Sequence, residues 1–328
     1  MISGKYWPAH PHPLPGESLS CWIVRTAHAN GLKVQTFCDR EFGKDFQIWN
    51  RDIDRNAPEW LLAIMSDKTG TPIKQVRNTT ARLYEKRLFP KLHSASQLRW
   101  FMALKKKHRT HKGYAQQYCP LCLKEDDEPY FRLQWRLALY TFCTKHRILM
   151  ADRCYHCGGE VEFHRLELGK ANQVKVETLD CCWICNKPLS SAPIQNVNLY
   201  PKLVDQRWSN LLESIDRQLY PAGALRYQNI TLLHQFCRLL SSGRYRPRLS
   251  KHICTSGHYS QPELKIDSVI FEQRDIIERH TLLQLAWWIM TNRNRIKTAI
   301  HRKAVRVNLL YRDLDPDTKR YVIGLLTH

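Results

Sequence analysis

The sequence predicts a mainly helical protein in which a cysteine-rich segment separates two helical regions. Three observations support this fold class. Apolar residues recur every three or four positions toward both ends of the chain, eight of the 12 cysteines lie between Cys119 and Cys185, and 328 residues are too many for one ordinary core. The expected division of the chain has four parts: a helical domain at 1–115, cysteine-rich modules at 116–190, a linker at 191–201, and a helical, basic domain at 202–328.

The N-terminal domain is expected to hold short amphipathic helices with helix-turn-helix character. Apolar spacing predicts helices over 19–30, 33–42 and 58–69. Gly70 stops the third helix, and the Thr-Pro pair after it supplies an N-cap and a first-turn proline for a fourth helix over 71–84. Two helices joined by a Thr-Gly turn occur both in helix-turn-helix modules and in plain helical hairpins, so this pattern leaves both open.

Helical periodicity returns after the linker. Apolar residues predict helices over 204–219 and 231–241, and again from about Asp267 onward. The intervening segment 242–266 has few apolar residues and is predicted to be a loop.

The chain is strongly basic, with 51 Lys and Arg against 30 Asp and Glu and a formal net charge of +21. Residues 51–150 carry 20 basic and 9 acidic side chains, and residues 201–328 carry 21 and 11. This surplus favours a partner with a phosphate backbone. The candidate nucleic-acid contacts are the basic residues of two clusters: Lys105, Lys106, Lys107, Arg109, Arg293, Arg295, Lys297, Arg302, Lys303 and Arg306. Solvated loops and helix ends are the alternative interpretation of both clusters.

Membrane and secreted proteins are excluded by the apolar pattern. The longest apolar stretches, such as Leu285–Met290, have six residues, far from the ~20 that span a bilayer. The first residues of the chain lack the apolar core of a secretory signal. We therefore expect a cytoplasmic protein that has no membrane contact and keeps its cysteines reduced or bound to metal.

The strongest chemical signal is a quartet of metal ligands. CPLC at Cys119 and Cys122 is followed twenty residues later by CTKH at Cys143 and His146. Zinc prefers four tetrahedral nitrogen and sulfur ligands, and two ligands three residues apart can converge on one ion from a single turn. Four protein ligands leave no open position, so the sequence predicts a structural rather than a catalytic site.

A second quartet follows at once and consists of two CxxC pairs: Cys154, Cys157, Cys182 and Cys185. Paired CxxC turns at this separation are typical of a zinc ribbon. The run CCWIC makes Cys181 a rival of Cys182, although Cys182 restores the CxxC spacing, and His156 is a further candidate ligand. The fold class is therefore mainly α with small zinc-stabilised β or loop modules, and we expect two structural Zn²⁺ per chain whose binding contributes to folding.

The sequence resembles the TniQ/TnsD family of transposon target-selection proteins in three segments: LPGESLSCWIVRTAHANGL at 14–32, YCPLC at 118–122 and PYFRLQWRLALYTFCTKHRILMADRCYHCGG at 129–159. The resemblance extends over roughly residues 11–190. It implies a helical N-terminal module with helix-turn-helix character, tandem zinc modules and a helical C-terminal region. It also implies that the two quartets above are the zinc ligands.

The resemblance implies a function in DNA transposition and no enzymatic activity. Members of this family mark a DNA target and recruit the transposon's AAA+ ATPase, which then brings the transposase. Some members read an attachment sequence themselves, and others attach to an RNA-guided CRISPR effector complex. Members can pair, so a homodimer is a further expectation, in a bacterial cytoplasm and in association with the nucleoid.

Two other classes of function compete with this one. A zinc hydrolase or a nucleobase deaminase would need an open metal position and a carboxylate base, and neither HxE nor HExxH occurs in the chain. The phosphate-binding motif GxxxxGK[ST] is also absent, so ATPase activity would belong to a partner. The alternative function is that of a zinc-ribbon or helix-turn-helix transcription regulator that binds DNA alone.

Overall fold

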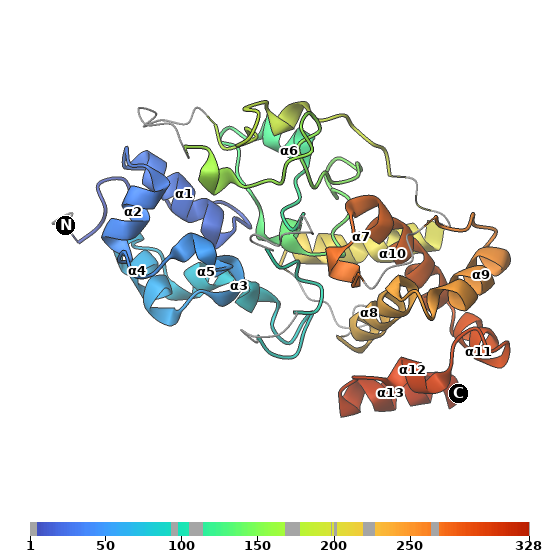
Figure 1. Cartoon of the computed structure of the whole chain (residues 1–328). Coiled ribbons are helices and arrows are strands. Elements are labelled where there is room, and N and C mark those ends of the chain that lie inside the picture. Colours follow the sequence, from blue (N-terminus) through green and yellow to red (C-terminus); the bar gives the residue numbers. More distant parts are fainter. Residues whose placement is uncertain are drawn as a thin grey trace. The chain divides into compact units, whose positions relative to one another are not determined.

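A computed structural model of the chain describes residues 5–92, 98–104, 114–167, 178–197, 199, 202–218, 227–263 and 269–327. The predicted fold class is confirmed, because these described residues are mainly helical and their β structure consists of isolated bridges. The chain divides into two compact units. The first comprises Met1–Glu85 and Lys91–Gln195, and the second comprises Lys86–Pro90 and Asn196–His328. The N-terminal helices and both cysteine quartets belong to the first unit (Figure 1).

The first unit contains these α-helices among its described residues: α1 Leu19–Ala29, α2 Val34–Glu41, α3 Ile53–Asn56, α4 Glu59–Thr69, α5 Ile73–Asn78 and α6 Pro120–Glu125. Helix α1 is central to this unit. Ser18 caps it by accepting a hydrogen bond from the Cys21 N–H at 3.3 Å. Residues 19–27 are all buried, because α2, α3 and the 3-10 turn Phe163–Arg165 pack against α1.

The turn that precedes α1 ties the helix to the cysteine-rich part of the unit. Gly16 has a φ of 70°, which favours glycine, and its carbonyl accepts a hydrogen bond from the Leu133 N–H at 2.7 Å. The buried Glu17 pairs with Arg25 at 3.0 Å, and burial raises the pKa of Glu17 against the lowering effect of Arg25. Arg25 also reaches Glu128 at 3.2 Å. The LPGES segment therefore anchors the helical and cysteine-rich parts to each other.

The prediction of a single helix over 71–84 is wrong in two respects. Thr71 does not cap the helix: α5 begins after Pro72 without a side-chain cap, and the Thr71 hydroxyl lies 2.7 Å from the His12 ring. The helix also ends early, at Asn78, and a 3-10 turn follows at Ala81–Tyr84. The hydroxyls of the two intervening threonines donate to backbone carbonyls of α5 at 2.7 and 2.8 Å, and such bonds compete with helix continuation.

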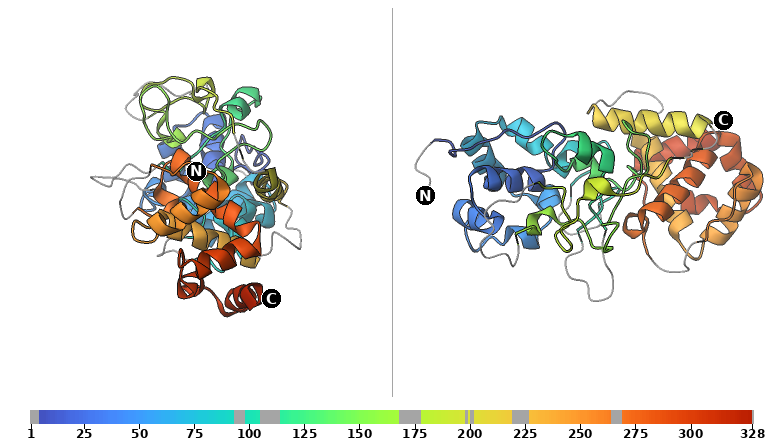
Figure 2. Two further views of the ribbon diagram at one scale, coloured as in Figure 1. Left: turned by 90° about the vertical axis from the view of Figure 1, so that its right-hand side faces the viewer. Right: turned by 90° about the horizontal axis from the view of Figure 1, so that it is seen from above.

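The second unit is a helical assembly: α7 Lys202–Asp216, α8 Tyr227–Ser241, α9 Arg246–Gly257, α10 Ile276–Met290, α11 Arg293–His301, α12 Val307–Tyr311 and α13 Pro316–Thr327 (Figure 2). Helix α10 packs against α7, α8, α9 and α11. Its buried residues, among them Leu283 and Ala286, lie on all sides of the helix. No helix among the described residues has the length and apolarity needed to cross a bilayer.

The predicted loop at 242–266 is wrong, because α9 occupies much of it. Pro247 lies in the first turn of α9, where a missing N–H costs nothing. Leu249 and Ile253 are 1% and 0% exposed, and α9 packs against α8 and α10. Two apolar side chains one turn apart, among Arg, Lys, His and Ser, are too weak a periodic signal to predict a helix. Their burial against neighbouring helices is nevertheless sufficient to stabilise one.

Candidate metal centres

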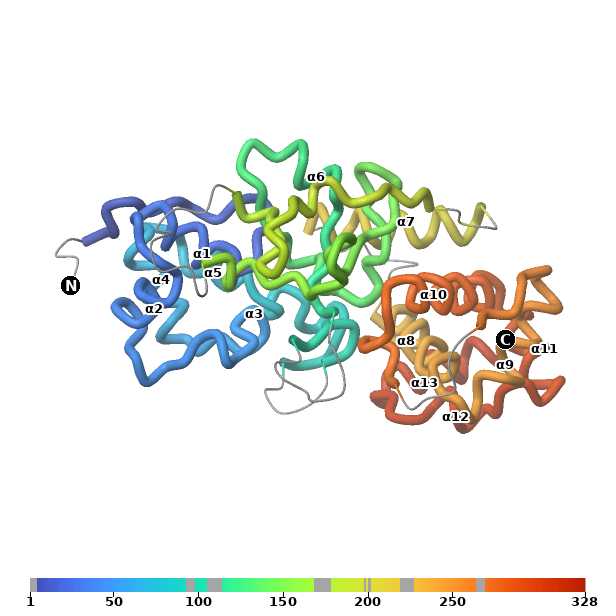
Figure 3. The backbone as a smooth tube through the Cα atoms, turned by 45° about the horizontal axis from the view of Figure 1, so that its top comes forward, coloured from blue at the N-terminus to red at the C-terminus, as the bar shows by residue number. Residues whose placement is uncertain are grey.

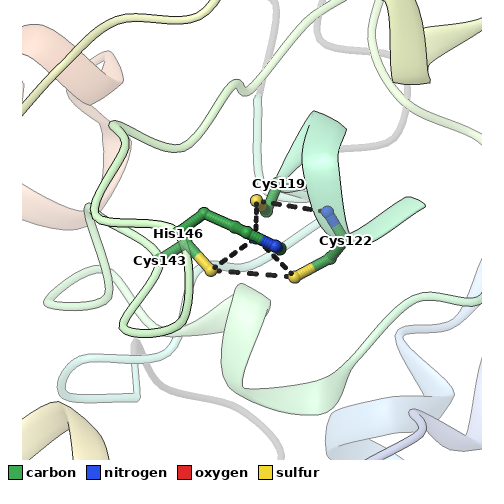
Figure 4. Close-up of side chains that lie close together, drawn as sticks. All are labelled: Cys119, Cys122, Cys143 and His146. Carbon is green, nitrogen blue, oxygen red and sulfur yellow. Dashed lines mark hydrogen bonds between the residues drawn. The ribbon is translucent and has the colours of Figure 1, made fainter. Parts of the chain in front are cut away.

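The first quartet converges on one point in the first unit (Figure 4). The ligand atoms of Cys119, Cys122, Cys143 and His146 all lie within 4.8 Å of one another. His146 Nδ1 lies 3.3 Å from the sulfur of Cys119, 3.4 Å from that of Cys122 and 3.6 Å from that of Cys143. The sulfurs of Cys122 and Cys143 are 3.7 Å apart. The sequence-predicted ligands therefore meet in space.

These separations fit a tetrahedral zinc ion. With Zn–S bonds of about 2.3 Å and a Zn–N bond of about 2.0 Å, tetrahedral geometry places two sulfurs about 3.8 Å apart and a sulfur and a nitrogen about 3.5 Å apart. Hydrogen bonds from Cys119 and Cys122 lower the pKa of Cys143 to about 2. Hydrogen bonding within the quartet thus favours the thiolate, the form that binds metal, at Cys143 and raises the pKa of Cys122. When bound, Zn²⁺ would supply structural cross-linking of α6 to the turn at 143–146.

Glu125 orients the histidine ligand. Its Oε2 lies 2.9 Å from His146 Nε2, the ring nitrogen that faces away from the quartet. Lys145 reaches the same carboxylate at 2.7 Å, and hydrogen bonds from Lys145 and His146 lower the pKa of Glu125. A carboxylate that accepts the second ring N–H fixes the tautomer with the lone pair on Nδ1. Glu125 is a supporting residue that the ligand spacing did not reveal.

The second quartet resolves the choice between neighbouring cysteines. Cys154 and Cys185 lie 3.6 Å apart through their sulfurs, as do Cys157 and Cys182, and the four ligand atoms lie within 4.8 Å of one another. Cys181 lies outside this group and contacts the Thr178 hydroxyl at 3.7 Å. The structure thus brings Cys182 into the group, as the CxxC spacing favours.

His156 is also outside the second quartet. Its ring lies against the Tyr155 ring, with the centroids 3.9 Å apart. Four sulfurs with separations near 3.6 Å fit a Zn²⁺ bound by cysteine alone. We expect this ion to hold the two CxxC turns together, because the segment around them has few residues with which to build a core.

Three ligand pairs share one backbone turn, which begins at Cys143, Cys154 and Cys182. In each turn the N–H of the first cysteine donates to the carbonyl five residues later, and the N–H four residues later donates back to the cysteine carbonyl, with distances of 2.8–2.9 Å. The residue four positions after the cysteine has a positive φ: 54° at Arg147, 68° at Gly158 and 56° at Asn186. The fourth pair differs, because Cys119 is the N-cap of α6. We call the three repeated turns the knuckles.

A buried ion network lies near α3 in the same unit. Arg136 is fully buried and contacts Asp52 at 2.7 Å and Asp54 at 2.8 Å. Asp54 also accepts hydrogen bonds from the backbone N–H and hydroxyl of Ser20 at 2.7 and 2.8 Å. Burial raises the pKa of Asp54, and Arg136 opposes that rise. The network links α1 and α3 to the segment before the first knuckle.

The predicted nucleic-acid contacts fall in different environments. Lys105, Lys106, Lys107 and Arg109 lie outside the described residues. Those that lie on the surface of the second unit are Arg293, Arg302, Lys303 and Arg306. Lys297 is half-buried.

Arg295 is engaged within the protein. Its guanidinium donates to the Trp288 carbonyl and to the Thr291 hydroxyl, both at 2.7 Å, and it lies 4.1 Å from the centre of the Trp288 ring. Desolvation lowers its pKa. Arg295 therefore satisfies acceptors at the C-terminal end of α10. Asn292 is likewise engaged, since its side chain accepts from the Asn294 N–H at the start of α11.

Three basic residues that sequence reasoning missed are Arg244, Arg248 and Arg312. They line a cavity together with Lys303 and Arg306. The three missed residues are spread over a segment predicted to be a loop and over the region after the C-terminal basic cluster. Only the tertiary packing of α9 against neighbouring helices brings them close to the predicted pair.

The fold and the two quartets define the class of protein: a mainly helical chain with tandem cysteine and histidine clusters of zinc type. Within this class, residues 8–150 match the family model described as TniQ. This match supports the assignment of residues 8–150 to the TniQ family. The first quartet lies inside the matched region and the second follows it. No curated protein matches the chain with significance.

Proposed function

We propose that the chain is a target-site selection adaptor in DNA transposition. In this proposal it associates with target DNA, either directly or through an RNA-guided CRISPR effector complex, and recruits the transposon's AAA+ ATPase, which brings the transposase. The TniQ domain at residues 8–150 carries the proposal, because the domain indicates a transposition-associated protein from a non-catalytic adaptor family.

The chemistry of the two quartets supports an adaptor rather than an enzyme. Each quartet supplies four protein ligands to one point, and a zinc ion with four protein ligands has no position for a substrate or a reactive water. Both centres would then act as braces. The first cross-links α6 to a knuckle, and the second joins the other two knuckles to each other.

The way the resemblance segments fold together supports one recognition module. Gly16, Glu17 and Arg25 tie α1 to the segment around Glu128 and Leu133 through the contacts described above. Zinc at the first quartet would also stabilise that segment, because the segment lies between the ligands Cys122 and Cys143 in the sequence. We propose that partners bind the surface of this helical module and that two chains pair into a homodimer.

A transposition assay tests the proposal. Cells that carry the transposon ends, the transposase, the AAA+ ATPase and this chain are compared with cells that lack the chain, and insertion sites are mapped. We expect loss of insertions at the preferred target without the chain, and retention of the ATPase by the tagged chain in a pull-down. Unchanged insertion sites and frequency in its absence would contradict the proposal.

The transcription-regulator alternative makes a different prediction. A regulator would protect a specific operator in footprinting with purified protein alone and would retain no ATPase. The adaptor instead needs the ATPase for its effect, whichever way it reaches DNA. The same two measurements therefore separate the two functions.

A further inference from the structure

A cavity of about 510 Å³ lies in the second unit and is lined by residues of α8, α9 and α12 and of the links α8–α9 and α11–α12. Figure 3 traces the backbone of these helices. Leu239 and Leu249 form part of its floor and are 5% and 1% exposed. Five of its lining residues are basic: Arg244, Arg248, Lys303, Arg306 and Arg312. We call this cavity the basic pocket.

The charge of the basic pocket is not balanced by its own lining. None of the residues that line it is acidic, and its five basic side chains are exposed. Two other arginines of this unit do have acidic partners: Arg238 pairs with Asp313 at 3.0 Å and Arg274 with Glu278 at 3.0 Å. No ion pair is found for the five pocket residues within the described part of the unit. Like charges within a Debye length of about 10 Å repel, so an anion that neutralises them would bind favourably.

The backbone turn at the end of α11 positions Lys303. α11 ends with the Ala304 N–H bonded to the Ala299 carbonyl at 2.8 Å and the Lys303 N–H bonded to the Ile300 carbonyl at 2.9 Å. This pair of hydrogen bonds is the helix-ending pattern in which the residue at position 303 adopts the left-handed conformation, where glycine is the usual choice. Lys303 occupies it with a φ of 55°. The turn thus fixes the backbone of Lys303 at the pocket that this residue lines.

We propose that the basic pocket binds the phosphodiester backbone of duplex DNA. Arginine forks match phosphate oxygens bidentately, and lysine adds a point charge. Tyr245 and Asn308 also line the pocket and offer a hydroxyl and an amide for phosphate or sugar oxygens. Backbone contacts of this kind position a protein on DNA without reading its sequence.

The number of charges favours a polymer over a single small anion. Five cations exceed the charge of one phosphate group, whereas duplex DNA presents one charge per about 1.7 Å of its axis. The inference rests on the DNA association in the proposed function and assigns that association to a place. It also separates Lys303 and Arg306, which line the pocket, from Arg295, whose guanidinium is engaged at the end of α10.

The test compares two charge-matched triple variants of the full, zinc-loaded chain. The pocket variant carries Arg248→Gln, Arg306→Gln and Arg312→Gln. The control variant carries Lys202→Gln, Arg217→Gln and Lys319→Gln, three exposed positions of the second unit outside the pocket lining. Binding of a fluorescent 30-base-pair duplex of arbitrary sequence is measured by anisotropy over a range of salt concentrations. Equal melting temperatures and zinc contents establish that both variants fold.

We expect the pocket variant to bind about 500-fold more weakly than the wild-type chain at 0.1 M salt, with a log–log salt slope shallower by about 2.7. Both figures follow from about 0.9 units of slope for each of three lost phosphate contacts. The control variant should stay within about threefold of wild type, because its side chains touch no phosphate. Equal losses in both variants, or none in the pocket variant, would overturn the assignment.

Two further outcomes separate this inference from the proposed function. If the wild-type chain binds the duplex and the pocket variant binds it equally well, the pocket assignment fails while DNA association stands. If the wild-type chain binds no duplex, direct DNA association fails as well, and retention of the ATPase still tests the adaptor function. Binding of a single-stranded RNA of equal length is measured in the same way, and ATP is added to the duplex complex at equal phosphate concentration. If the pocket variant loses affinity for the RNA alone, or if ATP displaces the duplex, duplex DNA is not the occupant of the pocket.

Discussion

Replacing Gly158 with alanine should weaken zinc binding at the second quartet about fivefold. Gly158 has a φ of 68° in the knuckle that begins at Cys154. A Cβ added there meets no atom within 4 Å, so steric overlap contributes nothing and only the backbone conformation matters. The left-handed conformation costs an L-residue about 1–2 kcal/mol, and the stiffer unfolded chain returns about 0.5–1 kcal/mol. The net loss of about 1 kcal/mol corresponds to about fivefold in affinity.

Asn186 provides the matched control, because it occupies the equivalent position in the knuckle that begins at Cys182. Asparagine tolerates the left-handed conformation better than most residues. Asn186→Gly should therefore change zinc affinity by no more than about twofold. The two substitutions act on the same ion and the same backbone geometry, and differ only in the residue that must adopt a positive φ.

The measurement is a competition between the full chain and a chromophoric chelator at pH 7. Folding and metal binding are coupled in so small a segment, so backbone strain appears directly as weaker zinc binding. The first quartet, unchanged in both variants, serves as the internal reference. Wild-type affinity in Gly158→Ala, or equal weakening in both variants, would refute the assignment of these turns as zinc knuckles.

The other predictions concern metal content, buried charge, a helix junction and acid stability. Metal analysis should give two Zn per chain, with chelation unfolding the cysteine-rich part of the first unit; fewer than one per chain would dismiss the tandem centres. Arg136→Met should cost about 3–5 kcal/mol in chemical unfolding because it strands the buried Asp54 carboxylate, and adding Asp54→Asn should recover part of the loss. Arg295→Ala should lower the melting temperature of the second unit, since it removes two hydrogen bonds at the end of α10. An unchanged melting temperature would contradict this structural role of Arg295 and favour the nucleic-acid contact that the sequence predicts. Burial lowers the pKa of His280 to about 4, below the value of about 6.5 in an unfolded chain, so stability present above pH 6.5 is lost as the pH falls toward 4. Thermal melts of His280→Phe should show a flatter profile in that window.

The sequence predicted both ligand sets because metal ligation leaves a local signature. Two ligands three residues apart must come from one turn, and this requirement survives any arrangement of the rest of the chain. The choice of Cys182 over Cys181 followed from the same spacing, and the structure agrees with it. A helix with strong apolar periodicity, such as α7, was predictable for a similar reason, since burial of one face repeats along the chain.

Other features depended on partners that are distant in the sequence. Helix α9 was missed because its own periodicity is weak and its stability comes from packing against α8 and α10. The role of Glu125 depends on a histidine 21 residues away, and that of Arg295 depends on acceptors at the end of the preceding helix.

What the sequence by itself determined is therefore the helical class, the two quartets of candidate metal ligands and the excess of positive charge. Net charge adds up along a chain whatever its fold, but a binding surface requires particular charges to converge. Only the tertiary structure placed Arg248, from a segment predicted to be a loop, beside Lys303, Arg306 and Arg312 around one cavity. The physical reason is that Coulomb attraction for a phosphate depends on distance in space, which sequence separation does not encode.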